Sequence, residues 1–389
     1  MKKICIVSFF HVEVSLCLAK YLAKQGVAVD IYMLADLLRD KGFMPGIEYK
    51  KAPKKLGVIG LNHDNCPITV DDSKGLPIRY YLLRVLSYSS KLYWVDKLIL
   101  KNAIRKIRKN HYDAVNIVGQ VPLVEYIYDN FKGENVIQTL HELPSHSGDG
   151  KMTPLIQKLI SDKTKTIFLS NATRQRFLKI KGASGALTET IPMGKFESQL
   201  LYERDLNIDL GLMPNIPTLL FYGFIKPYKG LDVLAEAYKL LGDFSSQFNL
   251  IIAGSGYDES LEFFRNFTNA IVLNRYMTDE EMLYLNRISD VVLLPYKSAS
   301  QSGIVLTSFL FGNPIIATKV GALVETIKDE VNGLLVAPNN PEEYANAMKR
   351  LITDANFLKR LKYGALQFGH GDEYDWNNIA KKTLDFYFK

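Results

Sequence analysis

Short apolar runs alternate with helical patterns along most of the chain, and this alternation restricts the fold more than any other feature. Six such runs follow one another in the second half, each with a helical pattern after it: "PTLLFYGF", "FNLIIAGSG", "AIVLNRYM", "DVVLLPY", "PIIATKVG" and "NGLLVAPN". The runs are continuously apolar, as in strands that are covered on both faces. Strict β–α alternation predicts a doubly wound parallel sheet.

The first half repeats the pattern less regularly. Its predicted buried strands are "KICIVSFF", "VAVDIYML", "YDAVNIVG", "NVIQTLHE" and "KTIFLSN", and a helix is expected over residues 13–25. Two such sheets in a chain of 389 residues predict two domains, with a cleft between them and ligands at the carboxyl ends of the strands. The linker is expected near residues 191–200.

Composition excludes some classes of protein. A hydrophobic content of 47% excludes wholesale disorder, and no run of about 18 apolar residues predicts a membrane span. The net charge of +7 suits an anionic partner: nucleotide phosphates, anionic lipid or nucleic acid. Three cysteines without metal-ligand spacing predict a reduced, cytoplasmic protein, and the apolar N-terminus is interpreted as a first strand.

The turn "YGFIKPYKGLDVL" places two lysines before a helix that opens at Gly230. A cation at a helix N-terminus opposes the macrodipole, at a cost of roughly 0.3–1 kcal/mol, and a bound anion would reverse that effect. Because the turn follows a central strand, we expect Lys229 to contact a phosphate. For Lys226 the sequence leaves phosphate contact and a solvated surface position open.

Two further loops are expected at the same edge of the sheet. In "IIAGSGYDESL", Gly254 and Gly256 would let a ligand approach the backbone or simply form a tight turn. In "SASQSGIVLTSFLFG" a small polar cluster could donate to a diphosphate or act as a plain helix cap; its members are Ser300, Gln301, Ser302 and Gly303. Three such loops at one strand edge favour an anion site.

Taken together, four blocks resemble the nucleotide-binding half of the retaining glycosyltransferases of family 4. They are "FYGFIKPYKGLDVLAEAYKLL", "LIIAGSGYDE", "SDVVLLPYKSASQSGIVLTSFLFGNPIIATKVGALVETI" and "NGLLVAPNNPEEYANAM". The blocks run from Leu219 to Met348 in the family's order and spacing, which makes the resemblance specific. The N-terminal half is similar only in pattern, through its opening strand and helix, "TLHELPSHSG" and "IPMG".

The resemblance implies the GT-B fold of two Rossmann-like, doubly wound domains. Residues 1–195 would form the acceptor-binding domain and residues 196–371 the nucleotide-sugar-binding domain. The tail with Trp376 is similar to a terminal helix that crosses back, so residues 372–389 would complete the first domain.

For the donor, the resemblance assigns Lys229 to the diphosphate. The arginine that usually follows the strand glycine is Phe224 here, and the resemblance implies that Lys226 takes over its charge, as similar subfamilies place a basic residue there. Glu325 matches the last position of a Gly-x-x-x-Glu segment, either contacting the ligand or bracing its helix.

In the first domain, His141 matches the histidine of a His-Asp pair near the donor sugar, with Glu142 in the aspartate's place. A satisfied polar group at a strand end is the alternative for this histidine. On this resemblance His141 and Lys229 are the candidate catalytic residues.

The chain departs from the family at its Glu-x7-Glu pair, whose positions hold Ala299 and Thr307. What remains resembles a Gln-Ser-Gly variant. Backbone donation from Gln301, Ser302 and Gly303 would then serve the phosphate or sugar, with Thr307 nearer the ribose. The carboxylate that contacts the sugar hydroxyls in the family is therefore absent from this chain.

The resemblance predicts a retaining, metal-independent hexosyltransferase of polysaccharide or glycoconjugate synthesis that uses a UDP- or GDP-linked sugar. In such transfer the leaving diphosphate accepts the acceptor's proton, so no protein nucleophile or base is needed and catalysis rests on orientation and charge stabilisation. A catalytically inactive family member acting as a scaffold or partner subunit is the alternative, because both glutamates are missing. A nucleotide-sugar epimerase lacks supporting residues, and nucleic acid is not the expected partner.

The acceptor, a glycan or a lipid-linked glycan, is expected on the first domain. His11 and Glu13 could contact it, or serve as cap and core residues. Residues 79–110 mix aromatic, aliphatic and basic side chains at helical spacing. They could lie on an anionic membrane, which would make the protein peripheral to its inner face, or belong to ordinary core helices with solvated lysines.

Overall fold

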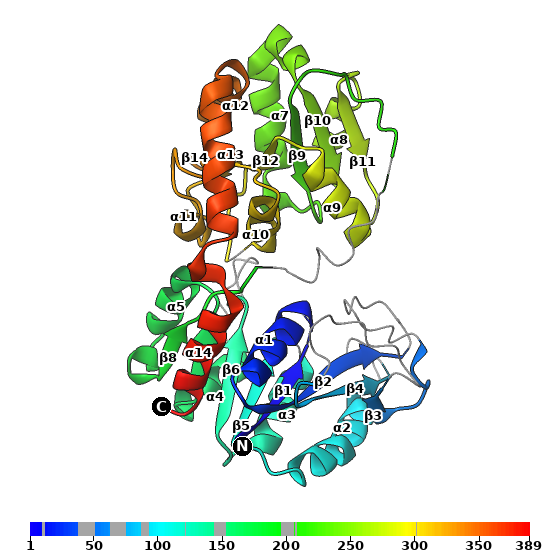
Figure 1. The fold of residues 1–389 in the computed structure, drawn as a ribbon, viewed down its shortest axis with the longest axis vertical. Helices are drawn as coiled ribbons and strands as arrows, with labels where there is room; N and C mark the ends of the chain where they lie inside the picture. The colour runs from blue at the N-terminus through cyan, green and yellow to red at the C-terminus, as the bar shows by residue number, and fades with distance from the viewer. Residues whose placement is uncertain are drawn as a thin grey trace. The chain divides into compact units, whose positions relative to one another are not determined.

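The chain forms two compact units in the computed structural model, which describes residues 1–9, 12–37, 51–62, 75–86, 93–120, 122–143, 153–195, 206, 208–300 and 302–389. Unit 1 comprises Met1–Leu201 and Glu373–Lys389, and unit 2 comprises Tyr202–Asp372 (Figure 1). Residues 196–200 of the predicted linker lie outside the described residues. No helix in the described part of the chain is long and apolar enough to cross a membrane.

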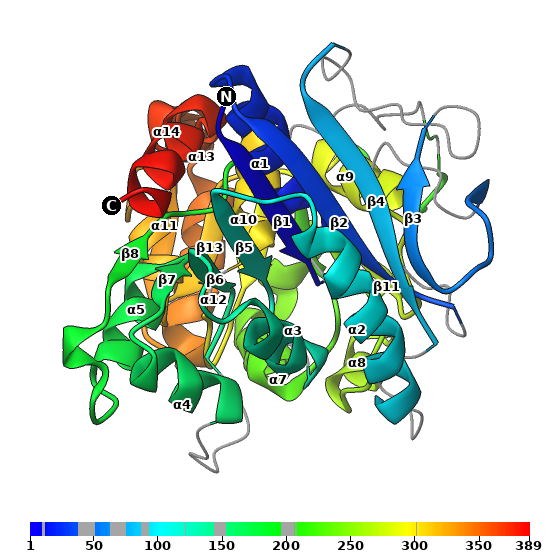
Figure 2. The ribbon, with the colours of Figure 1, turned by 90° about the horizontal axis from the view of Figure 1, so that it is seen from below.

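Unit 1 is built on an eight-stranded sheet in the order β3-β4-β2-β1-β5-β6-β7-β8 (Figure 2). All neighbouring strands are parallel except β3, which runs antiparallel to β4. The elements are β1 (Lys3–Ser8), α1 (Val12–Lys24), β2 (Ala28–Asp36), β3 (Gly57–Leu61), β4 (Ile78–Val85), α2 (Tyr93–Arg108), β5 (Ala114–Val118), α3 (Pro122–Phe131), β6 (Val136–Leu140), α4 (Pro154–Ser161), β7 (Lys165–Phe168), α5 (Asn171–Leu178), β8 (Thr188–Thr190) and α14 (Trp376–Tyr387).

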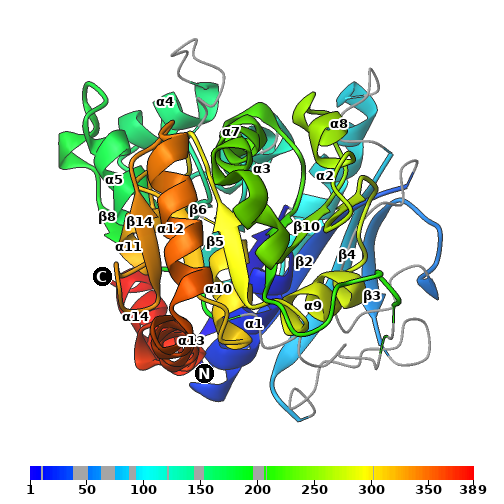
Figure 3. The same ribbon diagram turned by 90° about the horizontal axis from the view of Figure 1, so that it is seen from above.

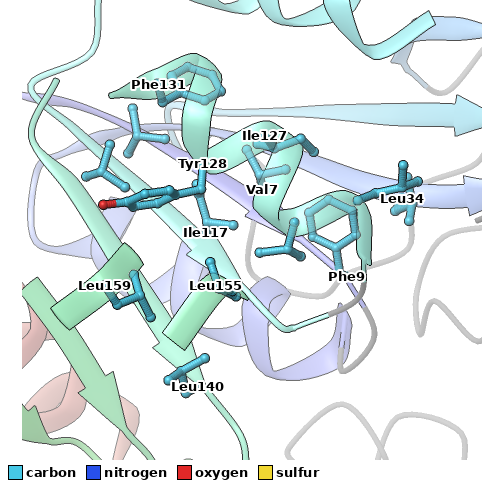
Figure 4. Packing of buried hydrophobic residues seen from close by; sticks show 14 of the residues in the cluster. Val7, Phe9, Leu34, Ile117, Ile127, Tyr128, Phe131, Leu140, Leu155 and Leu159 are labelled. Carbon is cyan, nitrogen blue, oxygen red and sulfur yellow. The ribbon is translucent and has the colours of Figure 1, made fainter. Parts of the chain in front are cut away.

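Apolar side chains from α2, α3, α4 and α5 pack against one face of this sheet. Figure 4 shows part of this core, where Ile127 and Phe131 of α3 and Leu155 of α4 approach Val7 and Ile117 of the sheet. All five side chains are buried. Burial on both faces explains why the strands are continuously apolar.

Helix α14 comes from the far end of the sequence and completes unit 1 beside α1. Trp376 is 1% exposed, its ring stacks near Tyr21 with centroids 6.4 Å apart, and its Nε1 donates to Lys195 O at 2.8 Å. At the other end of the helix, Lys165 Nζ and Asn135 Nδ2 donate to Tyr387 O at 2.8 and 3.0 Å.

Unit 2 has a six-stranded parallel sheet in the order β11-β10-β9-β12-β13-β14. Helices α7 and α12 lie side by side on one face (Figure 3), whereas α9, α10 and α11 contribute to the core on the other. The elements are β9 (Thr218–Tyr222), α7 (Leu231–Leu241), β10 (Asn249–Ala253), α8 (Ser260–Phe264), β11 (Ala270–Leu273), α9 (Asp279–Arg287), β12 (Val291–Leu294), α10 (Gly303–Leu310), β13 (Ile315–Thr318), α11 (Leu323–Thr326), β14 (Gly333–Val336), α12 (Pro341–Thr353) and α13 (Ala355–Gly369).

The strand order places a topological switch point between β9 and β12. Leu219 of β9 pairs with Leu250 of β10 on one side and with Val291 of β12 on the other. The chain leaves β9 in one direction and β12 in the other, so their following loops diverge at the carboxyl edge. Ligands of open α/β sheets bind at such a point.

The helical expectation for residues 79–110 is only partly right. Residues 78–85 form strand β4, and the helix begins at Tyr93. The segment IRYYLLRV has its second half buried on both faces, so its apolar residues show no clean strand alternation. Strands β3, β4 and β8 were all absent from the sequence prediction.

A buried carboxylate ties together the amino ends of four strands in unit 1. Asp30 of β2 is 2% exposed and accepts hydrogen bonds from Arg79 Nε of β4 at 2.6 Å and from the Tyr112 hydroxyl, before β5, at 2.5 Å. Lys3 of β1 lies 3.8 Å away. Two cations and a phenol therefore meet at one carboxylate, and the Tyr112 hydroxyl also shares a hydrogen bond of 3.0 Å with the Tyr32 hydroxyl.

Substituting Asp30→Asn should lower the free energy of unfolding of unit 1 by about 2–4 kcal/mol, because a buried pair that loses one partner leaves the other uncompensated. Urea unfolding followed by tryptophan fluorescence measures this unit alone, since both tryptophans of the chain, Trp94 and Trp376, belong to it. Tyr112→Phe, which removes the hydrogen bonds to Asp30 and Tyr32 but keeps the carboxylate paired with Arg79, should cost about 1–2 kcal/mol. Equal stability of Asp30→Asn and the parent protein would show that the network contributes nothing.

Candidate active site

The loops at the carboxyl edge of the unit 2 sheet are held together by direct backbone contacts. Ile225, after β9, donates its N–H to Ser255 O, after β10, at 2.8 Å. Lys297, after β12, donates to Tyr228 O at 2.7 Å. Gly254, after β10, donates its N–H to Leu273 O, at the end of β11, at 3.0 Å. The loops thus form one connected rim.

Glycines make these contacts possible. A Cβ on Gly254 would lie 2.0 Å from Gly223 O, and one on Gly256 would lie 2.1 Å from Ile225 O. Both glycines also have φ of +144°, which other residues rarely adopt. The packing of loop against loop therefore accounts for this Gly-x-Gly, and its contact with a donor stays a prediction.

A close backbone contact at a glycine also joins the loops after β12 and β13. Gly321 has φ of +50°, and a Cβ there would lie 1.5 Å from Ala299 O. Across the switch point, a Cβ on Gly230 would lie 1.9 Å from Pro295 O. The segment that lacks the expected glutamates is thereby fixed between two glycine contacts.

Lys229 is buried at the switch point. Its side chain belongs to the 3-10 turn Pro227–Lys229 and is 7% exposed. The Nζ atom lies 5.3 Å from the ring centroid of Tyr296, and it would be 2.7 Å from a Cβ on Gly223. The ammonium group therefore lies directly over the end of β9.

The charge of Lys229 is poorly compensated. Burial, and secondly the positive charge of Lys226, lower the pKa of the Lys229 side chain to about 8, and no carboxylate of the described residues contributes to this shift. Lys226 itself is exposed, one turn earlier in the same loop. A buried, uncompensated cation with a second cation beside it is suited to an anion.

Helix α10 begins on the other side of the switch point. Ser302 occupies its N-cap position with an extended backbone and makes no side-chain capping bond, and Gly303 is the first helical residue. No acidic residue lies in the first turn. The first N–H groups of a helix have no intrahelical acceptor, so this end can donate to an anion.

The other predicted residues of this segment differ in exposure. Ser300 and Thr307 are buried, and Thr307 lies within α10 rather than at its end. Gln301 lies outside the described residues. Glu325 is half-buried in the short helix α11, where its backbone carbonyl accepts from Lys328 Nζ at 2.7 Å.

In unit 1 the predicted residues lie at the carboxyl edge of their own sheet. His141 is buried directly after β6, and Glu142 beside it is exposed. Glu13 lies half-buried in the first turn of α1, after β1. His11 lies outside the described residues. The unit 1 sheet has its own switch point between β1 and β5, next to these positions.

Tyr296 is a residue that the sequence prediction missed. It follows β12, is 3% exposed, and packs edge-to-face on Tyr228 with ring centroids 6.0 Å apart. Burial, together with the neighbouring tyrosines, raises the pKa of its phenol well above the usual value. The sequence feature that could have identified Tyr296 is its position directly after the apolar run "VVLLP", at the expected end of a strand.

Comparison with known proteins supports the architecture. Residues 216–354 match the family model of glycosyl transferases group 1. An uncharacterized glycosyltransferase of Methanocaldococcus jannaschii is 30% identical over 200 residues, covering 50% of this chain and 50% of that protein. The chain spans about half the length of the curated relatives it matches most strongly.

Solved structures are similar over the whole chain. Sucrose-phosphate synthase from Thermosynechococcus elongatus has a TM-score of 0.69 at 17% identity, covering 100% of this chain and 98% of that one. HepE of Anabaena, in complex with UDP and glucose, has a TM-score of 0.65 at 14% identity, covering 99% of both chains. This chain therefore has the two-Rossmann GT-B fold, and the segment that carries its candidate site matches the group 1 glycosyl transferases.

Proposed function

We propose that the protein is a retaining glycosyltransferase that moves a sugar from a UDP- or GDP-linked donor to a glycan or lipid-linked acceptor. The observation that carries this proposal is the buried ammonium of Lys229, uncompensated by any described carboxylate, at the switch point of a sheet whose segment matches glycosyl transferases. The similarity in fold to HepE, solved with UDP and glucose, supports a nucleoside diphosphate as the anion.

In the proposed reaction the donor's diphosphate lies between Lys229 and the N-terminus of α10. The bond between the anomeric carbon and the diphosphate oxygen breaks while the acceptor oxygen bonds to the same face of that carbon. The acceptor's proton passes to the leaving diphosphate, so atoms and charge balance without a protein base. Lys229 and the helix N–H groups stabilise the charge that develops on the leaving group, and no step is assigned to a metal.

The residues of unit 1 are proposed for the sugar and the acceptor. His141 would lie near the donor sugar, and Glu13, with the loop after β1, near the acceptor. In unit 2, Thr307 would lie nearer the ribose, with the small polar residues of the same segment and Glu325 around the phosphate and sugar.

Ligand-dependent melting tests the donor. UDP or GDP at about 100 times its dissociation constant should stabilise the protein by about 2.7 kcal/mol, and glucose alone should have no such effect. Transfer to a glycan acceptor, with the product's anomeric configuration read by proton NMR, tests the reaction. The absence of a shift with every nucleoside diphosphate would contradict the donor class, and an inverted product would contradict retention.

An inactive scaffold is the second candidate, favoured by Ala299 and Thr307 at the positions where the family places glutamates. Such a protein would bind the nucleotide and neither transfer nor hydrolyse the donor above the uncatalysed rate. The melting and turnover measurements together therefore separate the two candidates.

The pH dependence of UDP affinity should report Lys229. With a pKa of about 8, its ammonium is charged below that pH and loses its proton above it. Because an anion binds the charged form, affinity should stay level up to about pH 7.5 and then fall, by at most about tenfold per pH unit. Calorimetric titration through this range measures it, and Lys226→Gln should move the fall to higher pH.

A further inference from the structure

The outer face of helix α2 in unit 1 exposes two large apolar side chains in an otherwise basic surface. Trp94 is 63% exposed and Leu98, one turn further on, is 55% exposed. At about 100° per residue, these two lie with Lys101 and Arg105 inside an arc of about 60°. Both cations are exposed. The stripe is therefore apolar in its first two turns and basic in the next two.

The buried residues of α2 keep this face of the helix directed towards solvent. Leu100, Ala103, Ile104 and Ile107 are buried in the core of unit 1 on the opposite side. Rotation of α2 to cover Trp94 would expose these four residues. The exposure of the apolar pair is thus a consequence of how the helix is anchored.

In the described part of the chain, the acidic groups on and next to α2 are already held in other interactions. Asp96, the one acidic residue of α2, is buried and accepts a hydrogen bond from Leu86 N at 2.7 Å. Glu134 pairs with Arg108 at 2.7 Å, near the C-terminal end. The segment before β3, against which α2 packs, adds two exposed lysines and another exposed leucine; these are Lys54, Lys55 and Leu56.

We propose that this face of α2 docks unit 1 on an anionic lipid bilayer, with Trp94 and Leu98 among the headgroups and Lys101 and Arg105 against the lipid phosphates. An amphipathic helix lies in the plane of an interface when it combines an apolar strip with flanking cations, and tryptophan favours this depth. Anionic lipid attracts each cation near the surface, whereas neutral lipid does not. A nucleic acid would use the cations but offers nothing to Leu98.

Docking does not require the donor or its turnover, so it can be tested apart from the proposed function. Its biological sense rests on that function, because a transferase held at a bilayer meets a lipid-linked acceptor in two dimensions. The measurement is therefore made without nucleotide, and its failure would leave the donor experiments intact.

The two tryptophans provide a direct signal. Trp376 is buried in the core of unit 1, so a change in emission on adding vesicles reports Trp94. The full-length protein should show a blue shift with phosphatidylcholine vesicles containing about 30% phosphatidylglycerol, and none with pure phosphatidylcholine. Co-flotation with the same vesicles gives the bound fraction. No shift and no co-flotation at about 0.15 M salt would overturn the proposal.

Paired variants distinguish this face from the general charge of the protein. Lys101→Glu with Arg105→Glu should weaken vesicle binding by at least about tenfold, because two attractive charges become repulsive. Lys359→Glu with Lys381→Glu changes the net charge equally at exposed positions elsewhere and should leave binding unchanged. Trp94→Ser with Leu98→Ser should lose binding while these lysine controls keep it. Equal loss in both charge pairs, or binding of a DNA duplex in preference to vesicles, would contradict bilayer docking by α2.

Discussion

Replacing Lys229 by methionine should strongly weaken UDP binding and at the same time raise the melting temperature of the ligand-free protein. The two effects have one cause, since the buried ammonium is stabilised by an anion and by little else among the described residues. Charge-assisted hydrogen bonds to a diphosphate contribute about 1.5–3 kcal/mol each, so affinity should fall by roughly ten- to a hundredfold or more. Turnover should fall further, because the leaving diphosphate gains charge in the transition state.

The gain in stability has a defined dependence on pH. The pKa of Lys229 lies at about 8 in the folded protein, compared with 10.5 for an exposed lysine. Below pH 8 both states are protonated and the folded state carries the whole cost of the buried charge, about 3 kcal/mol. As the pH rises towards 10.5 the folded state loses its proton first and that cost disappears. The gain in unfolding free energy from Lys229→Met should therefore be largest below pH 8.

Lys226→Met is the matched control for this experiment. Lys226 is exposed in the same loop, so its replacement should hardly change the melting temperature and should weaken UDP binding less. Differential scanning calorimetry at two pH values and titration with UDP measure both quantities. A Lys229→Met variant that melts lower and still binds UDP would show that the lysine is structural.

Alanine at Gly321 should cost about 3–5 kcal/mol of unfolding free energy and displace the segment around Ala299. The added Cβ would fall 1.5 Å from Ala299 O, and the φ of +50° is itself unfavourable for alanine. Because the obstacle is backbone, no side-chain rotation can relieve it. The displaced segment leads into α10, so UDP affinity should fall along with stability.

The variant Gly211→Ala distinguishes the steric clash of an added Cβ from the backbone strain of a positive φ. Gly211 also has positive φ, at +63°, but nothing lies within 4 Å of its Cβ position. Its substitution should cost only about 1–2 kcal/mol and leave UDP binding intact. An equal loss of unfolding free energy in Gly321→Ala and Gly211→Ala would show that the contact between Gly321 and Ala299 does not contribute to stability.

The donor half of the fold could be predicted because its signals are local. The six apolar runs of the second half form strands β9 to β14, and the turn that carries Lys229 follows β9 as expected. Each of these features depends on residues within a few positions of one another. The residues that predict each of these features therefore lie next to it in the sequence.

Features that depend on distant residues were not predictable. The partners of Asp30 lie 49 and 82 residues away, at positions that have no pattern in common. The same holds for the glycine contacts, since Gly321 is required by a carbonyl 22 positions earlier. The sequence left the exposure of Trp94 open between a membrane-facing surface and a core position, because an apolar residue in a helix is ordinarily expected to face the core.

The return of α14 to unit 1 has a consequence for biosynthesis. Unit 2 is a continuous stretch of chain, so all its strands can leave the ribosome and pair while translation continues. Most of unit 1 is synthesised before unit 2. It lacks helix α14, which packs on α1 and places the Trp376 ring over Gly194, until all of unit 2 has been synthesised. Unit 1 therefore matures after unit 2 although most of it is translated before unit 2, and during that interval the side of α1 that α14 covers stays exposed.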